Sequence, residues 1–515
     1  MKTMVVGWIL IYLLIATPVA AEEIQAQTPA VDEPLVLSLR DAIRNALEQN
    51  LELAVERQNP EIRRPEITVE KARFDPSLRL GVKGGKTIRP SASAADVAIL
   101  GAGAVSPIES NSLQYDLGIE QQWSSGGRYT LAWDVTRQGG VSTVFDPNFG
   151  SALSVTVTQP LLKGFGPAVN RTDLILAQNN FSVSRAAFER KAAEIAAGVE
   201  EAYWELVYLR KNYKVELEKR RSAQELFAMN RAKVEQGLIA PIEILVAEAA
   251  VADREEDVLS AEKQVRDAED RLRRDMNVSA SALQDIPIIP ADEPSVAPAE
   301  VRIREAVDTA LDERRDLREA RLELKNREQS VLQTRNQARP ALDFEGTAGL
   351  NGLGSTYADD LDRLSSRDFY SWEAGVVFTL PLGNRAARSA YIRQKMELEK
   401  TALNLKKLEQ DVMVELKEAV RSVETDQRRI VTTGKSRALA DKKLETETER
   451  LRLGLSTTQN VLEFQKDLAE AQRREIRAIV DYNKSQTRLA RARGTLLRDR
   501  GIVLESSLRD RERNP

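Results

Sequence analysis

The segment 37–53 reads LSLRDAIRNALEQNLEL, and the segment 301–317 reads VRIREAVDTALDERRDL. The two segments align without a gap, and the alignment extends over residues 37–82 and 301–346 at a constant offset of 264. A repeat with so long a period differs from the short units of solenoid proteins, which run ~20–50 residues. The sequence therefore predicts a duplicated unit whose two halves do equivalent structural work.

A second block of the same repeat aligns residues 200–277 with residues 417–494 at an offset of 217. Within this block Gly237 falls on Gly454, in a short stretch between two helical patterns. Because the offset drops from 264 to 217 between the blocks, the first copy carries 47 additional residues in its middle. We therefore expect two equivalent halves, of which the first is elaborated.

The composition limits the chemistry that this chain of 515 residues can perform. Charged residues make up 30% and aromatic residues 5%, which favours long helices rich in surface. A net charge of −4 provides no basic field for nucleic acid. The chain has no cysteine and no histidine, so it lacks thiol and imidazole nucleophiles and the usual zinc ligands. We expect no catalytic residues, no metal, no cofactor and no nucleic-acid partner; an enzyme with paired carboxylates is the alternative.

Changes of composition divide the chain into segments. Lys2 precedes an apolar run at 5–16, and small residues follow it, a pattern typical of a secretory signal peptide. The run is too short for a membrane-spanning helix, which needs ~20 residues, and an uncleaved anchor is the alternative. In chain order we expect a signal peptide (1–21), a flexible lead-in (22–36), the first repeat (37–282), a linker with four prolines (283–300), the second repeat (301–497) and a charged tail (498–515).

Each repeat should open with helices. Ser38 and Asp41 form a capping-box pattern at the start of a helix over 38–49. A further helical stretch reaches Phe74, and we expect Pro60 and Pro65 to interrupt it. The equivalent stretch of the second repeat, 317–338, contains no proline.

Strands are predicted next, over about 76–160 and 341–381, because apolar and polar residues alternate with period two. A tight turn at 124–127 contrasts with longer loops at 84–112, 139–150 and 351–368, an asymmetry typical of outer-membrane barrels. Three tryptophans of these strands suit interfacial aromatic girdles, namely Trp123, Trp133 and Trp372. A soluble sandwich with one hydrated face is the alternative.

Helical hairpins follow the strands, at about 170–281 and 384–497. Each long helix runs without proline for ~100 Å at 1.5 Å per residue, and a shorter helix returns after a Gly-Leu pair. Apolar residues recur at helical spacing, while the opposite faces are densely charged. Helices this long and polar need coiled-coil partners.

This arrangement resembles the TolC-type outer-membrane efflux channels. The resemblance covers about 37–497 and rests on the order of elements in each repeat and on matching segments: LSLRDAIRNALEQN (37–50), VTVTQPLLKGFG (155–166), EQGLIAPIEILVAEAA (235–250), VVFTLPLGNRA (376–386) and LRLGLSTTQNVLEFQ (451–465). It implies an α+β membrane protein with two internal repeats per chain. Three chains would share a β-barrel in the outer membrane, continued by a helical coiled-coil barrel in the periplasm.

The resemblance also implies roles for particular residues. Prolines at the strand–helix junctions redirect the chain in this family; the matches are Pro76, Pro160, Pro340 and Pro381. The hairpin tips dock onto a periplasmic adaptor; the matches are Gly237, Leu238, Ile239, Gly454, Leu455 and Ser456. The alternative is structural, since proline ends strands and glycine ends helices in any protein.

A constriction at the tunnel mouth is the third implied feature. The matching positions are Glu463 and Asn460, with Glu243 at the comparable place of the first tip. Three copies of Glu463 would form an acidic ring that favours cations. Because Asn460 is not acidic, a strong cation block is less expected than in relatives with two acids, and Glu463 on a solvated helix face is the alternative.

The implied function is a passive exit duct of a tripartite efflux or type I secretion system. Its partners would be two further copies of the chain, a periplasmic adaptor, an inner-membrane pump (RND, ABC or similar) and outer-membrane lipid. Between its first and last strands the first repeat carries 43 extra residues, which suggest a second hairpin and six strands per chain instead of four, inside or outside the barrel. A periplasmic adaptor is the alternative class; it would show one central hairpin and no barrel strands.

Overall fold

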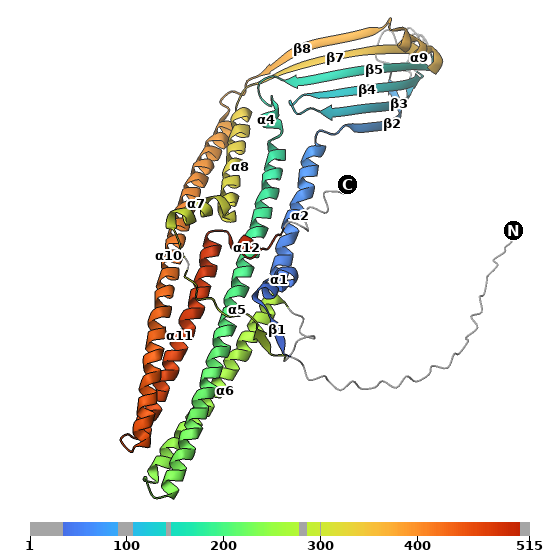
Figure 1. The fold of residues 1–515 in the computed structure, drawn as a ribbon. Helices are drawn as coiled ribbons and strands as arrows, with labels where there is room; N and C mark the ends of the chain where they lie inside the picture. The colour runs from blue at the N-terminus through green and yellow to red at the C-terminus, as the bar shows by residue number, and fades with distance from the viewer. Residues whose placement is uncertain (1–33, 91–106, 141–145, 278–285, 299, 505–515) are drawn as a thin grey trace, which may run out of the picture.

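The computed structural model describes residues 34–90, 107–140, 146–277, 286–298 and 300–504. Figure 1 shows an elongated molecule with a sheet at one end and long helices leading away from it. The predicted signal peptide at 1–21 lies outside the described residues, as do most of the lead-in and the end of the tail.

Four long helices form two antiparallel hairpins, as the repeat predicts. Their bounds are α5 Thr172–Glu235, α6 Ile242–Met276, α10 Arg385–Arg452 and α11 Thr458–Ala492. Helix α5 packs on α6 and α11, and α11 packs on α10, so the order across the layer is α6, α5, α11, α10 (Figure 1). In the described part of the chain, every helix is too short or too polar to cross a bilayer.

Each repeat opens with a short helix followed by a longer one. These are α1 Leu39–Gln49 and α2 Leu51–Ala72, then α7 Ile303–Glu313 and α8 Arg315–Gln337. The Ser38 hydroxyl accepts a hydrogen bond from the Asp41 backbone N–H at 3.1 Å, so the predicted cap of the first helix is confirmed. Helices α2 and α8 both pack against α5, and α8 also packs against α10.

The prediction that Pro60 and Pro65 interrupt the second helix is wrong. Helix α2 continues through both prolines to Ala72. Each proline removes one backbone N–H from the helix, which ordinarily costs several kcal/mol. Here α2 packs along α5 and Pro60 is itself buried, so tertiary contact holds the chain in a helix that local sequence opposes.

Six antiparallel strands form one sheet in the order β2-β3-β4-β5-β7-β8. Their bounds are β2 Ser77–Pro90, β3 Pro107–Gln122, β4 Arg128–Gly139, β5 Asn148–Pro160, β7 Ala341–Gly354 and β8 Tyr370–Thr379. The tight turn after β3 is confirmed, since the Trp123 N–H donates to the Gly127 carbonyl at 2.7 Å. The additional residues of the first repeat therefore build the hairpin β3–β4 inside the sheet, between β2 and β5.

The sheet joins the two repeats and leaves both of its edges open. Strand β5 of the first repeat pairs with β7 of the second, with Phe149 opposite Gly354 and Pro160 opposite Asp343. Strands β2 and β8 lie at the two edges of the sheet (Figure 1). Their residues are exposed along almost the whole length of both strands. Long exposed edges carry unpaired backbone groups and invite pairing with another chain.

The expectation of a plain loop over 351–368 is wrong. Strand β7 extends to Gly354, and α9 Tyr357–Ser366 follows it. The Thr356 hydroxyl caps this helix by accepting from the Asp359 N–H. Asp360 is buried and accepts a hydrogen bond from the Ser151 N–H at 3.0 Å, so the helix is held by its contact with β5.

The segments expected to be a flexible lead-in and a linker contain a small parallel sheet. Strand β1 Leu35–Leu37 pairs with β6 Ile288–Pro290. Tyr203 of α5 is fully buried beneath this sheet and donates to Asp292 at 2.8 Å. The lead-in and the linker are therefore ordered where they meet α5, because each supplies the other's hydrogen-bond partners.

Three apolar clusters hold the helices together. The largest joins α1, α5, α6 and the parallel sheet, the second joins α7 to α10 and α11, and the third lies near the hairpin tips. The charged tail, predicted from 498 onward, begins within the first cluster. Helix α12 Leu496–Asp499 precedes Ile502 and Leu504, which pack there, and Arg500 forms an ion pair with the buried Glu200.

Candidate functional site at the hairpin tips

The two hairpin tips have the same backbone design. Gly237 and Gly454 follow α5 and α10 with φ of 73° and 76°, the left-handed region that favours glycine. At the first tip the Gly237 N–H donates to the Val234 carbonyl and the Leu238 N–H to the Lys233 carbonyl. The second tip has the same two hydrogen bonds at the equivalent residues of the second repeat. This is the Schellman motif, and it turns each long helix into its return helix.

The turn places one leucine of each tip in solvent. Leu238 is 67% exposed and Leu455 is 66% exposed, and Leu453 beside the second turn is also exposed. Ile239 is half-buried. Each tip therefore presents an exposed leucine at the matching place, at the end of the molecule away from the sheet.

A buried asparagine links the two tips. Asn230 of α5 is 1% exposed, and its amide donates to the Glu243 carbonyl at 3.3 Å and to the Thr458 hydroxyl at 2.9 Å. The first turns of both return helices therefore meet at one side chain. Asn230 is not among the residues predicted from the sequence, although it interrupts the apolar spacing of Ala223 and Leu226, which is a detectable signal.

Ser456 and Asn460 take part in the start of α11. The Thr457 hydroxyl caps the helix by accepting from the Asn460 N–H, and the Asn460 amide donates to Ser456 at 3.4 Å. Ser456 in turn donates to the buried carboxylate of Glu447, which Arg450 also contacts at 3.1 Å. Both predicted residues therefore stabilise the tip structure within one chain.

Among the described residues, no hydrogen bond or ion pair joins the predicted constriction residues Glu243, Asn460 and Glu463 to one another. Glu463 is exposed on α11, one turn beyond Asn460, and Glu243 is half-buried on the first turn of α6. Neither glutamate side chain has an ion-pair partner among the described residues. A small apolar cluster, formed by Leu226, Ala250, Leu451, Val461 and Leu462, packs the tips together beside them.

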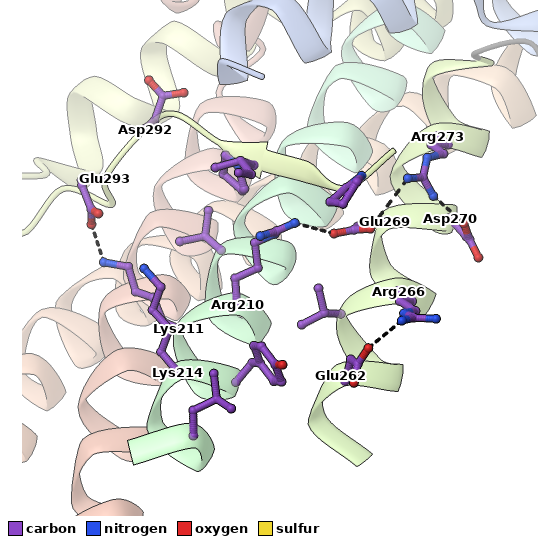
Figure 2. A pocket seen from close by; sticks show the side chains of 17 residues that line it. Arg210, Lys211, Lys214, Glu262, Arg266, Glu269, Asp270, Arg273, Asp292 and Glu293 are labelled. Atoms are coloured by element: carbon purple, nitrogen blue, oxygen red, sulfur yellow. Dashed lines mark hydrogen bonds and ion pairs between the residues drawn. The ribbon is translucent and has the colours of Figure 1, made fainter. Parts of the chain in front are cut away.

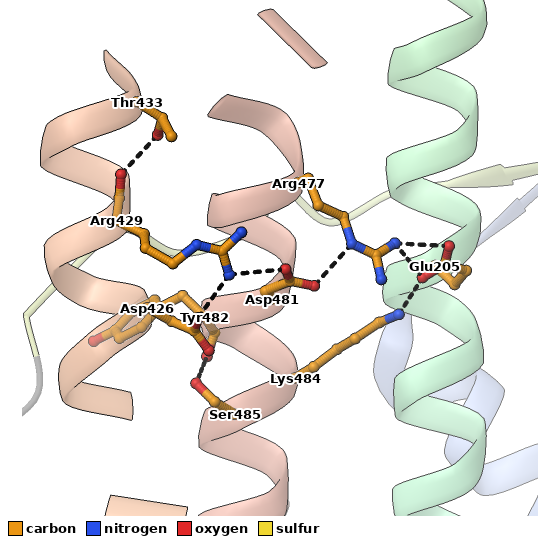
Figure 3. Close-up of polar contacts among 9 residues, drawn as sticks. All are labelled: Glu205, Asp426, Arg429, Thr433, Arg477, Asp481, Tyr482, Lys484 and Ser485. Carbon is orange, nitrogen blue, oxygen red and sulfur yellow. Dashed lines mark hydrogen bonds and ion pairs between the residues drawn. The ribbon is translucent and has the colours of Figure 1, made fainter. Parts of the chain in front are cut away.

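Higher along the helices, ion pairs join the two repeats (Figure 3). Glu205 of α5 accepts two hydrogen bonds from Arg477 of α11 at 2.9 Å and contacts Lys484. Asp481 links Arg477 to Arg429 of α10 at 2.9 and 3.2 Å. Partial burial would raise the pKa of Glu205, but Lys484 and Arg477 together hold that pKa below its ordinary value.

A cavity of about 770 Å³ lies between α5, α6 and β6 (Figure 2). Its charged side chains are largely paired with each other, such as Arg210 with Glu269 at 2.7 Å and Arg266 with Glu262 at 2.6 Å. Balanced charge gives the cavity no preference for an anionic or cationic ligand. In the described part of the chain, no group of acidic side chains is arranged to hold a metal ion.

The four predicted prolines all lie where the sheet meets the helices. Pro76 and Pro340 stand directly before β2 and β7, Pro160 is the last residue of β5, and Pro381 lies between β8 and α10.

Comparison with known proteins defines the class. A family model described as outer membrane efflux protein matches residues 42–278 and 306–495. Among solved structures, the outer-membrane channel OprN has a TM-score of 0.64 at 15% identity, covering 89% of this chain and 90% of its own. The CmeC outer membrane channel of Campylobacter jejuni has a TM-score of 0.61 at 16% identity, with 92% and 90% covered.

The open state of the MtrE outer membrane channel of Neisseria gonorrhoeae is also similar. Its TM-score is 0.59 at 17% identity, and 89% of each chain is covered. No curated protein sequence matches this chain. At these identities the structural likeness establishes the fold.

The sheet and its long helical projection thus define an outer-membrane channel subunit. The chain belongs to the outer membrane efflux protein family, whose model matches both repeats. It is an efflux channel of the outer membrane that extends into the periplasm, and the predicted family, fold and location are confirmed.

Proposed function

We propose that three copies of this chain form one passive duct, which a periplasmic adaptor and an inner-membrane pump open for export. The observation that carries the proposal is the pair of open edges at β2 and β8, together with the exposed leucines at the tips. With six strands in the described part of the sheet, β2 and β8 run in opposite directions, so β8 of one copy can pair antiparallel with β2 of the next. Three copies then close an 18-stranded barrel without free edges.

The adaptor would bind the two tips. The exposed Leu238 and Leu455 each suit the tip of another helical hairpin, and the two equivalent tips would provide equivalent contacts. Separating the tips would require breaking the Asn230–Thr458 hydrogen bond and the apolar cluster around it. The pump, whether RND, ABC or similar, would supply the energy, since we expect no reaction in the duct itself.

Glu463 would surround the tunnel mouth as a ring of three carboxylates. We expect purified protein in a planar bilayer to show small, long-lived openings with a preference for cations, because an acidic ring raises cation occupancy. Glu463→Gln should reduce that preference, whereas the control Glu445→Gln, at an exposed position on α10, should leave it unchanged. Openings with equal cation preference in both variants would remove Glu463 from the mouth. A protein without conductance that salt washes from membranes would instead favour the adaptor class.

A further inference from the structure

The internal repeat specifies contacts that a single chain cannot make. Along the layer α6, α5, α11, α10, the seam between α5 and α11 lies within the chain, and α6 and α10 are its outer edges (Figure 1). The repeat maps α5 onto α10 and α6 onto α11. The contact of α5 with α11 therefore predicts an equivalent contact of α10 with α6 of another copy. This step rests on the trimer proposed above.

Midway along the long helices the repeat identifies a specific ion pair. Within the chain, Arg488 of α11 binds Glu201 of α5 through two hydrogen bonds of 2.9 and 3.1 Å. The offset of 217 maps these residues onto Arg271 of α6 and Glu418 of α10. Both are exposed, and neither has an ion-pair partner among the described residues. Arg271 and Glu418 are therefore the same residue types as Arg488 and Glu201, at the equivalent positions of the repeat.

In the half of the helices near the sheet, the positions that are polar within the chain correspond to apolar residues at the equivalent positions of the repeat. Within the chain, Asn179 of α5 donates to Asn326 of α8 at 2.8 Å. The offsets of 217 and 264 map these residues onto Met396 of α10 and Ile62 of α2. Because α5 and α10 are continuous, the offset of 217 holds along their length. Met396 is 65% exposed and Ile62 is 61% exposed in the single chain.

Both residues belong to longer apolar stripes with the spacing of a coiled coil. The exposed stripe of α2 consists of Leu51, Val55, Ile62 and Val69, and that of α10 consists of Ile392, Met396, Leu403 and Val414. Their spacings of four, seven and eleven residues keep each stripe on one helix face. Large apolar stripes rarely stay in water, so each requires a partner.

We infer that α10 of one protomer packs against α2 and α6 of a second copy, with its apolar stripe on the α2 stripe and Glu418 paired with Arg271 of the partner subunit. The seam between subunits is then apolar in the half near the sheet and charged lower down. At the equivalent positions within one chain the contacts are the Asn179–Asn326 hydrogen bond near the sheet and the Glu201–Arg488 ion pair lower down.

Cross-linking of the full-length protein in detergent tests the apolar half, since the chain contains no cysteine of its own. The variant Ile62→Cys/Met396→Cys should give dimers and trimers on a denaturing gel after treatment with a short bis-maleimide. The control Asn179→Cys/Asn326→Cys should give only cross-linked monomer. The preparation should have the native mass of a trimer. If the control then reacts while the Ile62→Cys/Met396→Cys variant stays monomeric on the gel, the seam is refuted, and the apolar stripes of α2 and α10 face lipid or solvent. A native mass of one chain would instead refute the trimer.

A charge exchange tests the charged part of the seam. Glu418→Arg and Arg271→Glu should each lower the temperature at which the trimer dissociates, and the double variant should recover most of the loss. Glu201→Arg with Arg488→Glu is the matched exchange within the chain. It should affect unfolding of the subunit without selectively affecting dissociation. Single variants at 418 and 271 that dissociate like the unchanged protein would overturn the ion pair.

Discussion

At the residue scale, one backbone requirement explains why a glycine follows the long helix in both repeats. Gly237 and Gly454 occupy the same left-handed position after helices of 64 and 68 residues. A Cβ at either glycine would meet no atom within 4 Å, so space does not explain the residue type. The backbone angle does, because a side chain in this region crowds the adjacent carbonyl.

Substituting alanine at these glycines should therefore destabilise the protein through backbone strain alone. We expect Gly237→Ala and Gly454→Ala each to lower the free energy of unfolding by about 1 kcal/mol. The control is Gly198→Ala, inside α5 and equally free of neighbours, which should raise it by about 0.5–1 kcal/mol because alanine favours a helix interior. Denaturant unfolding in detergent measures all three, and effects of one sign at all positions would contradict this account.

At the scale of elements, the seam between α5 and α11 is held by ionised side chains. Acidic residues of α5 face basic residues of α11 at several heights, with Glu201 opposite Arg488, Glu205 opposite Arg477 and, at 3.6 Å, Glu216 opposite Arg473. Isolated surface pairs contribute little, but a series along one seam is partly shielded from water and acts together. Its strength should therefore follow the ionisation of the glutamates.

Stability of this seam should fall in acid. The pKa of Glu205 is held below its ordinary value of 4.5, so its contribution is fully present above that pH and is lost as the pH falls through the lowered pKa. At pH 7 the Glu205→Gln variant should unfold at a lower temperature than the unchanged protein. The difference between the two unfolding temperatures should shrink below about pH 4.5. Glu445→Gln, at an exposed position on α10, is the control and should show no such convergence. A difference that persists at low pH would assign the effect of Glu205 to packing.

At the scale of the whole molecule, the sheet is the elaborated part. Strands β7 and β8 form the minimal sheet of the second repeat, whereas the first repeat inserts β3 and β4 between β2 and β5. Because the insertion is a hairpin, the strand directions on either side of it are unchanged. The sheet can therefore gain or lose this hairpin while both helical hairpins stay on the same side.

Removing residues 107–139 tests this reading of the sheet. We expect β2 to pair directly with β5, giving four strands per chain and a trimeric barrel with a diameter smaller by about a third, because diameter grows roughly linearly with strand number. Electron microscopy of the trimer in detergent measures the diameter. An unchanged diameter would place the hairpin outside the wall of the barrel.

Much of this architecture follows from the sequence by itself. The long helices, the hairpin turns at Gly237 and Gly454 and the alternating strands depend on neighbours a few residues apart, so local pattern predicts them. The repeat then orders these elements in two equivalent halves. The four prolines fall at the junctions for the same local reason, since proline suits neither a helix interior nor a central strand.

Contacts between distant residues were decided only by the tertiary structure. Leu35–Leu37 forms a strand because Ile288–Pro290 lies beside it, and α2 continues through Pro60 because α5 supports it. Asn230 joins the two tips because the hairpins, more than 200 residues apart, pack together. Each case depends on a partner that chain folding brings close, and the free energy of that contact outweighs the local preference. A pattern of neighbouring residues therefore cannot predict such a partner.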